Sequence, residues 1–555
     1  MNNAKNSTNG KSHQHSYNFL IQGGILAIAG IVVRIIGMIY RVPLTHIIGD
    51  RGNSLYSNAY DVYSIILIIS SYSLPVAVSK MMAGKYSTKE YVNADRIFKG
   101  ALIYALIVGS LGAVLAYAAA PVLVKAEGAV PVLRVLAPVI FFSAILGTFR
   151  GLFQGQGTMI PTSISQILEQ LVNAGVSVLA AWLLVRPFVV EDPEDLLPRR
   201  GAMGSTLGTG AGVIAGLAFV VLVYFLYRPD LKRRTARGQV QPVDSYGQIL
   251  KAIFLTVTPM VISAGLYNVS PFIDNYMIYG IMVKLGYTQE HIQNIHGIYS
   301  GRYLLMVNIP VAFANALSSS MIPTISAAKS KGDESDILNK AKLTIKVSMM
   351  IAIPCAIGLA VLGGPFLDII LPTNQSFPFL AEQLLMGGST FVIFFAYSTV
   401  TNAILQATDH LNLPVIHSAI ALVVHVVMAF FCIRFLDMNV WGLMISTIVF
   451  AVVLCVLNSI SLYRKLGLKT ELRTGLLIPL ISSLIMGAVC FFIYQMFLLL
   501  TSSKLIAFIL AFVVALIIYI VAMILLKGVT EQELLRMPKG QLMVKLLKKV
   551  HLLKD

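Results

Sequence analysis

The sequence has few charged residues. Only 12% of its 555 residues are charged, whereas 57% are hydrophobic, and the mean hydropathy is +0.79. A soluble domain of this length could not keep so apolar a surface in water. No connection between the apolar runs is long enough to form a separate catalytic domain. The composition therefore predicts an all-α polytopic membrane protein.

Cysteine is also scarce. The four cysteines, Cys355, Cys432, Cys455 and Cys490, each lie within an apolar stretch. None takes part in a CxxC or Cys/His spacing, so the sequence indicates neither a disulfide framework nor a metal site. We expect no cofactor.

Acidic residues are outnumbered, 25 against 42 lysines and arginines, which gives a net charge of +17. The basic residues gather in short connections between apolar stretches, in alternate connections along the chain. This is the pattern that orients membrane proteins and not a nucleic-acid surface. It predicts a multi-pass protein of a bacterial plasma membrane with both termini in the cytoplasm. No small-residue cleavage site follows the first apolar run, so we expect that run to be a retained helix.

Stretches of bilayer length recur about fourteen times, the first over 18–42 and the seventh over 249–283. The ends of the second and eighth (LPVAVSKMMAGKYS and IPTISAAKSKG) share the order Pro, Ser, Lys. This repeat predicts two six-helix lobes with a substrate cavity between them. The expected organisation is a polar cytoplasmic tail (1–17), an N-lobe (18–240), a C-lobe (241–470), two further spans (471–528) and a basic amphipathic tail on the anionic inner surface (529–555).

Three cations interrupt stretches that are otherwise apolar: Arg34, Lys80 and Arg302. A cation in hydrocarbon costs several kcal/mol unless it faces a watery cavity or a partner, so such residues usually mark a pathway. We therefore expect an anionic cargo.

Arg41 shares a helix face with Arg34. Gly30, Arg34, Gly37 and Arg41 are spaced as i, i+4, i+7 and i+11, so the glycines thin the face from which the arginines project. The planar fork of arginine suits phosphate. The alternative for Arg41 is that it reaches the membrane interface.

The acidic residues set in spans are Asp274, Glu169 and Asp61. An intramembrane carboxylate can carry a proton, help to bind sodium or neutralise an arginine. Asp274 is the candidate for coupling, with an ion pair as its alternative. For Glu169 we weigh a cap on the cavity against packing beside the loops, and Asp61 is expected to pair near the outer face. The glycines at 204, 208, 212 and 216 predict close helix packing.

Three segments carry a family resemblance: FRGLFQGQGTMIPTSISQILEQ, LPVAVSKMMAGKYS and RIIGMIYRVPLTHIIGD. They resemble the MOP exporter superfamily (multidrug, oligosaccharidyl-lipid, polysaccharide), and within it the group of stage V sporulation protein B and the MurJ-type lipid II flippases. The resemblance runs from about Asn18 to about Lys527. It implies alternating access and transfer of an undecaprenyl-pyrophosphate-linked sugar precursor, lipid II first among them, to the outer leaflet for cell-wall synthesis. It also implies that the last two spans line a groove for the lipid tail.

The resemblance further implies that Arg34, Lys80 and Arg302 are the substrate-binding cations of the cavity. Lys80 stands where the family has an arginine, and Arg41 departs by one position from the related spacing. A sodium site of some flippases uses acids on the seventh and eleventh spans. Asp274 could supply the first, but the eleventh span has His417 and His425 and no carboxylate.

Two other functions stay open at this point. A multidrug or cation antiporter predicts a cavity dominated by acids, against the cations found. A membrane-embedded glycosyltransferase needs paired carboxylates near the interface, and the one acidic connection, EDPED at 191–195, lies beside Arg199 and Arg200. We therefore expect a transporter and not an enzyme, acting as a monomer. Its expected partners are a lipid-linked anionic saccharide, anionic lipids and cell-wall synthesis proteins, with no nucleic acid.

Overall fold

The fold is described from a computed structural model, which covers residues 25–26, 28–186, 196–236, 242–330, 332–371, 374, 376–469 and 471–529. The predicted tail 1–17, the acidic connection 191–195 and residues 530–555 of the predicted basic tail lie outside the described residues. The chain forms two compact units, residues 1–300 and 301–555.

The first unit is a helical bundle that opens with an apolar helix, Ile28–Ile39. The elements that follow are α2 (Arg41–Leu67), the π-helical η1 (Ile68–Tyr72), α3 (Leu74–Ser87), α4 (Tyr91–Ala118), α5 (Ala120–Leu123), α6 (Val130–Gly155), α7 (Ile160–Val185), α8 (Leu196–Ala236), α9 (Tyr246–Asn268), α10 (Ser270–Lys284) and α11 (Gln289–Ile298). A second π-helical segment, η3 (Tyr299–Tyr303), leads out of this unit.

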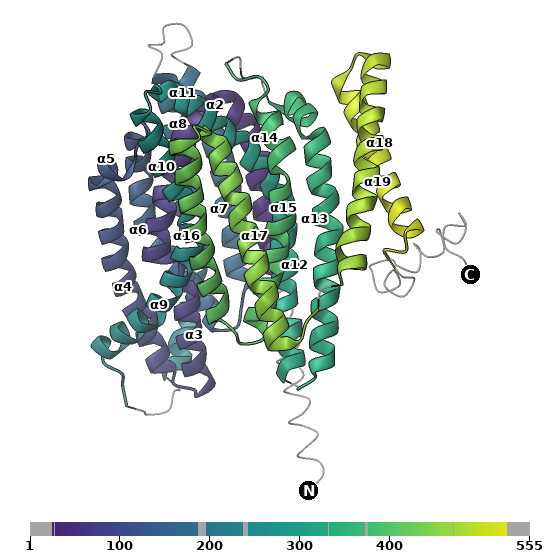
Figure 1. Cartoon of the computed structure of the whole chain (residues 1–555). Helices are drawn as coiled ribbons and strands as arrows, with labels where there is room; N and C mark the ends of the chain where they lie inside the picture. The colour runs from purple at the N-terminus through teal and green to yellow at the C-terminus, as the bar shows by residue number, and fades with distance from the viewer. Residues whose placement is uncertain are drawn as a thin grey trace. The chain divides into compact units, whose positions relative to one another are not determined.

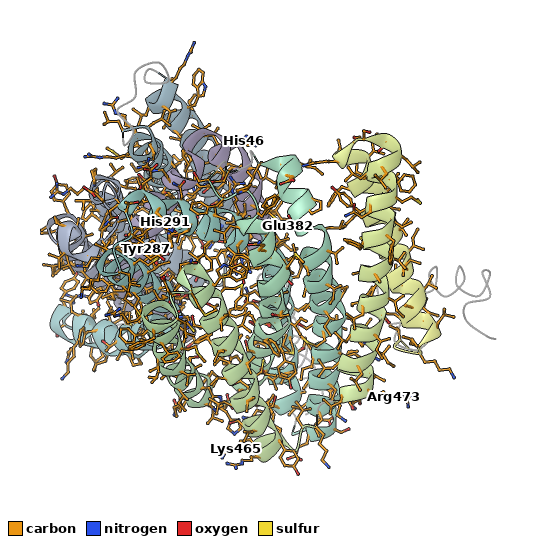
Figure 2. The ribbon with its side chains drawn as sticks, turned by 45° about the horizontal axis from the view of Figure 1, so that its top comes forward. His46, Tyr287, His291, Glu382, Lys465 and Arg473 are labelled. Carbon is orange, nitrogen blue, oxygen red and sulfur yellow. The ribbon has the colours of Figure 1, made fainter. Side chains whose placement is uncertain are left out.

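The second unit is also helical. Its elements are α12 (Leu304–Ser330), α13 (Glu334–Ile370), α14 (Leu380–Gly388), α15 (Thr390–Ala407), α16 (Asn412–Phe435), α17 (Asn439–Leu466), the π-helical η4 (Arg473–Leu477), α18 (Ile478–Thr501) and α19 (Lys504–Leu525). The pair α18 and α19 packs beside α13 (Figure 1). Lys465 and Arg473 lie near one end of this unit, and Glu382 on α14 lies toward the opposite end (Figure 2).

The predicted fold class is confirmed. Within the residues described, 12 helices are long and apolar enough to cross a membrane, and two shorter apolar helices, Ile28–Ile39 and Tyr246–Ile262, stand where the first and seventh spans are expected. The helices α9, α10 and α11 pack in the first compact unit, although the sequence repeat assigns them to the C-lobe. The lobe boundary at 240 rests on that repeat and stays a prediction.

The first and seventh spans differ in detail from the predicted helices. Hydrogen bonds from Tyr40 N to Ile36 O (3.1 Å) and from Leu44 N to Tyr40 O (3.2 Å) carry the helical path past residue 42. The helical path breaks at Gly49, whose φ of 67° is unfavourable for a residue with a side chain.

The stretch 249–283 is two helices, α9 and α10. Pro271 in the first turn of α10 has no N–H to continue the preceding helix.

Helix α3 packs on a glycine face of α6. A Cβ on Gly151 would lie 2.8 Å from Val78 Cβ, and one on Gly155 would lie 2.8 Å from Met82 Cβ. Val78 and Met82 are one turn apart, so they define the face of α3 turned to α6. Lys80 projects from the other side of α3 and is exposed.

Helices α7 and α8 are in equally close contact, as the glycines spaced by four predict. A Cβ on Gly204 would lie 2.6 Å from Ala181 Cα, and one on Gly212 would lie 2.5 Å from Glu169 O. Ser177 Oγ donates to Ser205 O across the same contact (2.7 Å). The packing expectation for these glycines is confirmed.

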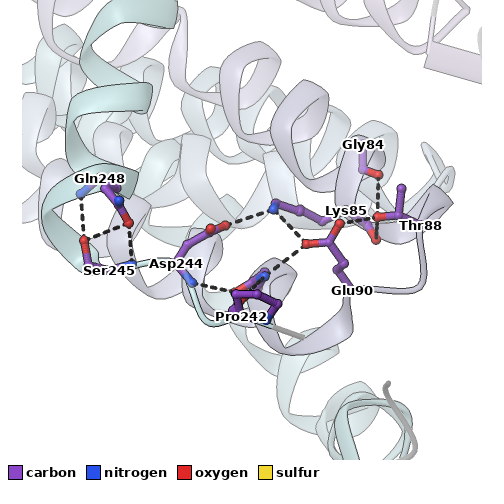
Figure 3. Close-up of polar contacts among 9 residues, drawn as sticks. Gly84, Lys85, Thr88, Glu90, Pro242, Asp244, Ser245 and Gln248 are labelled. Atoms are coloured by element: carbon purple, nitrogen blue, oxygen red, sulfur yellow. Dashed lines mark hydrogen bonds and ion pairs between the residues drawn. The ribbon is translucent and has the colours of Figure 1, made fainter. Parts of the chain in front are cut away.

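The start of α9 is anchored to the turn between α3 and α4 (Figure 3). Lys85 Nζ lies 2.8 Å from Glu90 Oε2 and 2.9 Å from Asp244 Oδ2. Asn93 Nδ2 donates to Pro242 O (3.1 Å), and Asn93 Oδ1 accepts from Asp244 N (3.0 Å). The Lys85 ammonium, with hydrogen bonds from Asn93 and Thr88, lowers the pKa of Glu90 to about 2. We call these residues the Lys85 cluster.

Candidate functional site

Arg41 lies among tyrosines in the first unit. It is half-buried, hydrogen-bonds to Tyr40, and lies in electrostatic range of Tyr56 and Tyr60 on α2. The Tyr56 and Tyr60 rings stack at 5.4 Å between centroids, one helical turn apart. Arg41 therefore lies among polar aromatic side chains and is not an isolated charge at a helix end.

Asp61 and Asp274 meet near Arg41. Asn275 on α10 donates to Asp61 Oδ2, and Asn58 Nδ2 donates to Asn275 Oδ1 at 3.1 Å. Asp274 and Arg41 both act electrostatically on Asp61. Asp274 itself is buried and accepts from Ser270 Oγ at 3.4 Å. The structure thus brings one predicted cation and two predicted acids together at the contact between α2 and α10.

Glu169 has an arginine partner. Arg150 Nη2 on α6 lies 2.6 Å from Glu169 Oε2 on α7, and Arg150 Nε donates to Ser165 Oγ at 2.9 Å. Both side chains are largely buried, with 13% and 29% of their surface exposed. Of the roles open to an intramembrane carboxylate, Glu169 therefore neutralises an arginine.

The other predicted cations differ in their exposure. Arg34 and Lys80 are exposed, and among the residues described neither forms an ion pair. Arg302 begins the second unit, lies in the π-helical η3 and is buried, with 6% of its surface exposed. Short π-helical segments often occur at functional positions. The substrate-binding role of the four cations stays a prediction for Arg34, Arg41, Lys80 and Arg302.

The second unit contains an apolar groove of about 560 Å³, lined by α12, α13, α18 and α19. Pro310, Gly358, Phe366 and Phe512 are among the residues that line it. The Tyr519 hydroxyl, the most polar group of the wall, donates to Met350 O at 2.7 Å. Because this hydrogen bond satisfies it, the groove offers an occupant hydrocarbon contacts almost exclusively.

A family model described as polysaccharide biosynthesis protein matches residues 20–329, which is more than half of the chain. The chain belongs to this family. A second model, MatE, matches residues 304–431. With the fold, these matches place the chain in the polysaccharide transporter branch of the MOP superfamily and confirm the resemblance. Its family and fold are those of multi-pass membrane transporters of the bacterial plasma membrane.

Curated relatives from Bacillus subtilis (strain 168) resemble this family member over most of its length. Lipid II flippase MurJ is 25% identical, with 73% of this chain and 75% of that protein covered. The uncharacterized membrane protein YabM is 26% identical over 95% of this chain and 96% of its own length. Stage V sporulation protein B is 23% identical, with 81% and 84% covered.

Solved structures share the fold. A multidrug resistance MATE family transporter of the MOP superfamily, in an inward-facing conformation, gives a TM-score of 0.64 at 15% identity over 79% of this chain and 98% of that one. Lipid II flippase MurJ in an inward closed conformation gives 0.63 at 13% identity over 90% and 97%.

Sequence reasoning missed Arg150, Tyr56, Tyr60 and Asn275. Arg150 lies inside the apolar helix α6, so the rule that singled out Arg34 could have found it. The two tyrosines carry no signal of this kind, since tyrosine is common in membrane helices and at their interfaces.

Proposed function

We propose that this protein is a flippase that moves an undecaprenyl-pyrophosphate-linked sugar precursor, lipid II foremost, from the inner to the outer leaflet by alternating access. It performs no covalent chemistry in this proposal. The precursor serves peptidoglycan or a related cell-wall polysaccharide, and both termini of the protein lie in the cytoplasm. The relatives named MurJ and stage V sporulation protein B support a cargo of this class.

The apolar groove carries the proposal. A polyprenyl tail is a long hydrocarbon without polar groups, and the groove is walled by apolar side chains, with the Tyr519 hydroxyl hydrogen-bonded to Met350 O. The groove is formed in part by α18 and α19, the two helices beyond the twelve of the predicted lobes. A water-soluble drug or a metal cation would make no favourable polar contact with such a surface, which argues against the antiporter alternative.

The head group needs cations, which the first unit supplies in Lys80, Arg34 and Arg41 and the second unit in Arg302. In this proposal Lys80 and Arg34, both exposed, meet the pyrophosphate first, and Arg41 and Arg302 receive it later. An inside-negative potential favours outward movement of the anion by roughly 2.3 kcal/mol per charge per 100 mV.

The test is outer-leaflet accessibility of lipid II to an externally added cleaving enzyme, in cells depleted of their own flippase. Wild type should restore cleavage, and Arg34→Ala should not. Gly358→Leu tests the groove, because Gly358 lines it and a Cβ there would meet open space, so the new side chain fills the groove without backbone strain. The matched control is Gly175→Leu on α7, which is exposed and also meets no neighbour.

Restored cleavage by wild type and Gly175→Leu, with loss in Gly358→Leu at equal membrane abundance, supports the tail site. If Gly358→Leu works as well as wild type, the groove does not hold the tail. If wild type restores nothing although it is present in the membrane, lipid II is not the cargo.

A further inference from the structure

A buried polar network joins α15, α16 and α17 in the second unit. His417 on α16 has 6% of its surface exposed, and Asn458 on α17 has none. His417 Nδ1 lies 2.7 Å from Asn458 Oδ1, and His417 Nε2 lies 3.1 Å from Ser461 Oγ. Both ring nitrogens therefore have a partner within an apolar helix bundle. The transport scheme above does not use this histidine.

The partners of Asn458 determine which ring nitrogen carries the proton. Asn458 Nδ2 donates to Ser398 O (3.3 Å), Thr401 Oγ1 (3.0 Å) and Asn402 Oδ1 (2.9 Å) on α15. Its Oδ1 therefore faces His417 and can only accept. The neutral ring must carry its hydrogen on Nδ1, so the lone pair of Nε2 points at Ser461 Oγ.

Ser461 can serve both protonation states of this ring. A serine hydroxyl donates one hydrogen bond and accepts others, and its O–H rotates freely. Beside neutral His417 it donates to Nε2, and beside protonated His417 it accepts from Nε2. A proton can thus be added at Nε2 while each hydrogen bond of the network is kept. A network that served only to lock three helices together would not require a partner able to reverse its role.

The network lies near the basic end of the unit. His417 is in the second turn of α16, and half-buried Ser461 precedes exposed Arg464 and Lys465 at the end of α17, where Figure 2 labels Lys465. Nε2 is therefore about one to two helical turns from the exposed cations at that end.

The three helices of the network, α15, α16 and α17, contain no Asp or Glu. On α15 the Tyr397 hydroxyl bonds Ser459 Oγ, and on α17 Cys455 Sγ bonds Phe394 O. The remaining titratable side chains of α16 and α17, which the structure describes in full, are His425, Cys432, Arg434, Tyr463, Arg464 and Lys465. Asp409, in the turn before α16, pairs with Lys329 at 2.7 Å. A charge on His417 would therefore add to Arg464 and Lys465 without a counter-ion.

We propose that His417 is a proton-binding site and that the proton it takes up at Nε2 is the coupling ion of the transport cycle. The ligand is a proton and not sodium, because sodium needs several oxygen ligands, whereas the accepting atom here is a ring nitrogen. Protonation places a charge between α16 and α17, next to two cations, and so favours a state in which their basic ends separate or hydrate. The coupling rests on the proposed function, and the proton binding does not.

The binding itself is tested by nitrogen NMR on the full chain in lipid nanodiscs with all nine histidines labelled. His417→Gln identifies the His417 signals by their loss. As the pH is lowered we expect these signals to change from the Nδ1–H neutral form to the doubly protonated ring. Ser461→Ala removes the acceptor of the new N–H, so the same change should need a lower pH. If the His417 signals stay in the neutral form throughout, the network is only a helix lock and the proposal is wrong.

The coupling is tested by the lipid II accessibility assay at high and low external pH. The rate of lipid II transfer by wild type should change several-fold between the two pH values. His417→Gln should lose this pH dependence. The control His410→Gln, at a half-buried position in the turn before α16, should keep it. An identical pH response in His417→Gln and wild type overturns the coupling. If wild type moves no lipid II while the NMR titration is seen, the cargo is wrong and the proton site stands.

Discussion

Alanine at the glycines of α8 should lower stability in proportion to the overlap that the structure predicts. In Gly204→Ala the new Cβ would lie 2.6 Å from Ala181 Cα, and in Gly212→Ala it would lie 2.5 Å from Glu169 O. Both neighbours are backbone atoms, so the helices must move apart. Overpacking of this kind costs about 1–3 kcal/mol. Alanine returns about 0.5–1 kcal/mol through backbone entropy, which leaves a net loss near 1–2 kcal/mol.

Two further glycines provide matched controls. At Gly216 the nearest backbone atom, Ser165 O, is 3.2 Å away, so the two effects should nearly cancel. At Gly175, on the facing helix, no atom lies within 4 Å, so alanine should stabilise by about 0.5–1 kcal/mol. Detergent-induced unfolding followed by the fluorescence of Trp182, which lies on α7, measures the whole series. If Gly204→Ala and Gly175→Ala have the same free energy of unfolding, the close contact between α7 and α8 is contradicted.

Two other predictions concern ion pairs. Because the pKa of folded Glu90 is lowered to about 2, against an ordinary value near 4.3, the Lys85 cluster stabilises fully above about pH 4.3 and is lost as the pH falls toward 2. Glu90→Gln should therefore lower the free energy of unfolding at neutral pH and weaken its dependence on pH between those two values. The same pH dependence in Glu90→Gln and wild type would contradict this. Glu169→Gln should cost about 2 kcal/mol, below the range for a fully buried pair, because Arg150 keeps 13% of its surface exposed. Adding Arg150→Met should recover much of the loss, and no recovery in the same unfolding assay would argue against the pair.

The parts of the fold that depend on local patterns could be predicted from the sequence. Apolar runs of bilayer length predict the spans, and glycines spaced by four predict the α7–α8 contact, since each needs only the period of a helix. The missed features depend on how helices face one another. Arg150 meets Glu169 across 19 residues of chain, and Asn58 meets Asn275 across 217. No spacing rule gives such a register.

The groove was expected from the family resemblance alone. Its walls come from one face each of α12, α13, α18 and α19, and each face reads in the sequence as ordinary lipid-facing hydrocarbon. The break between α9 and α10 has a signal in the sequence, Pro271, although the span reads as one apolar stretch. Hydropathy continues across Pro271, while the helical hydrogen bonds do not.

The anchoring of α9 has a mechanical consequence. One end of this helix is held by the Lys85 cluster through Pro242 and Asp244, and a capping box at Ser245 and Gln248 makes its first turn rigid. The other end meets α10 at Val269, where the helical ladder is interrupted. Helix α9 is thus held at its first turn, contains Pro259 in its interior and is interrupted at its far end. Bending at Pro259 or at Val269 would displace the far end of the helix while the Lys85 cluster stays in place.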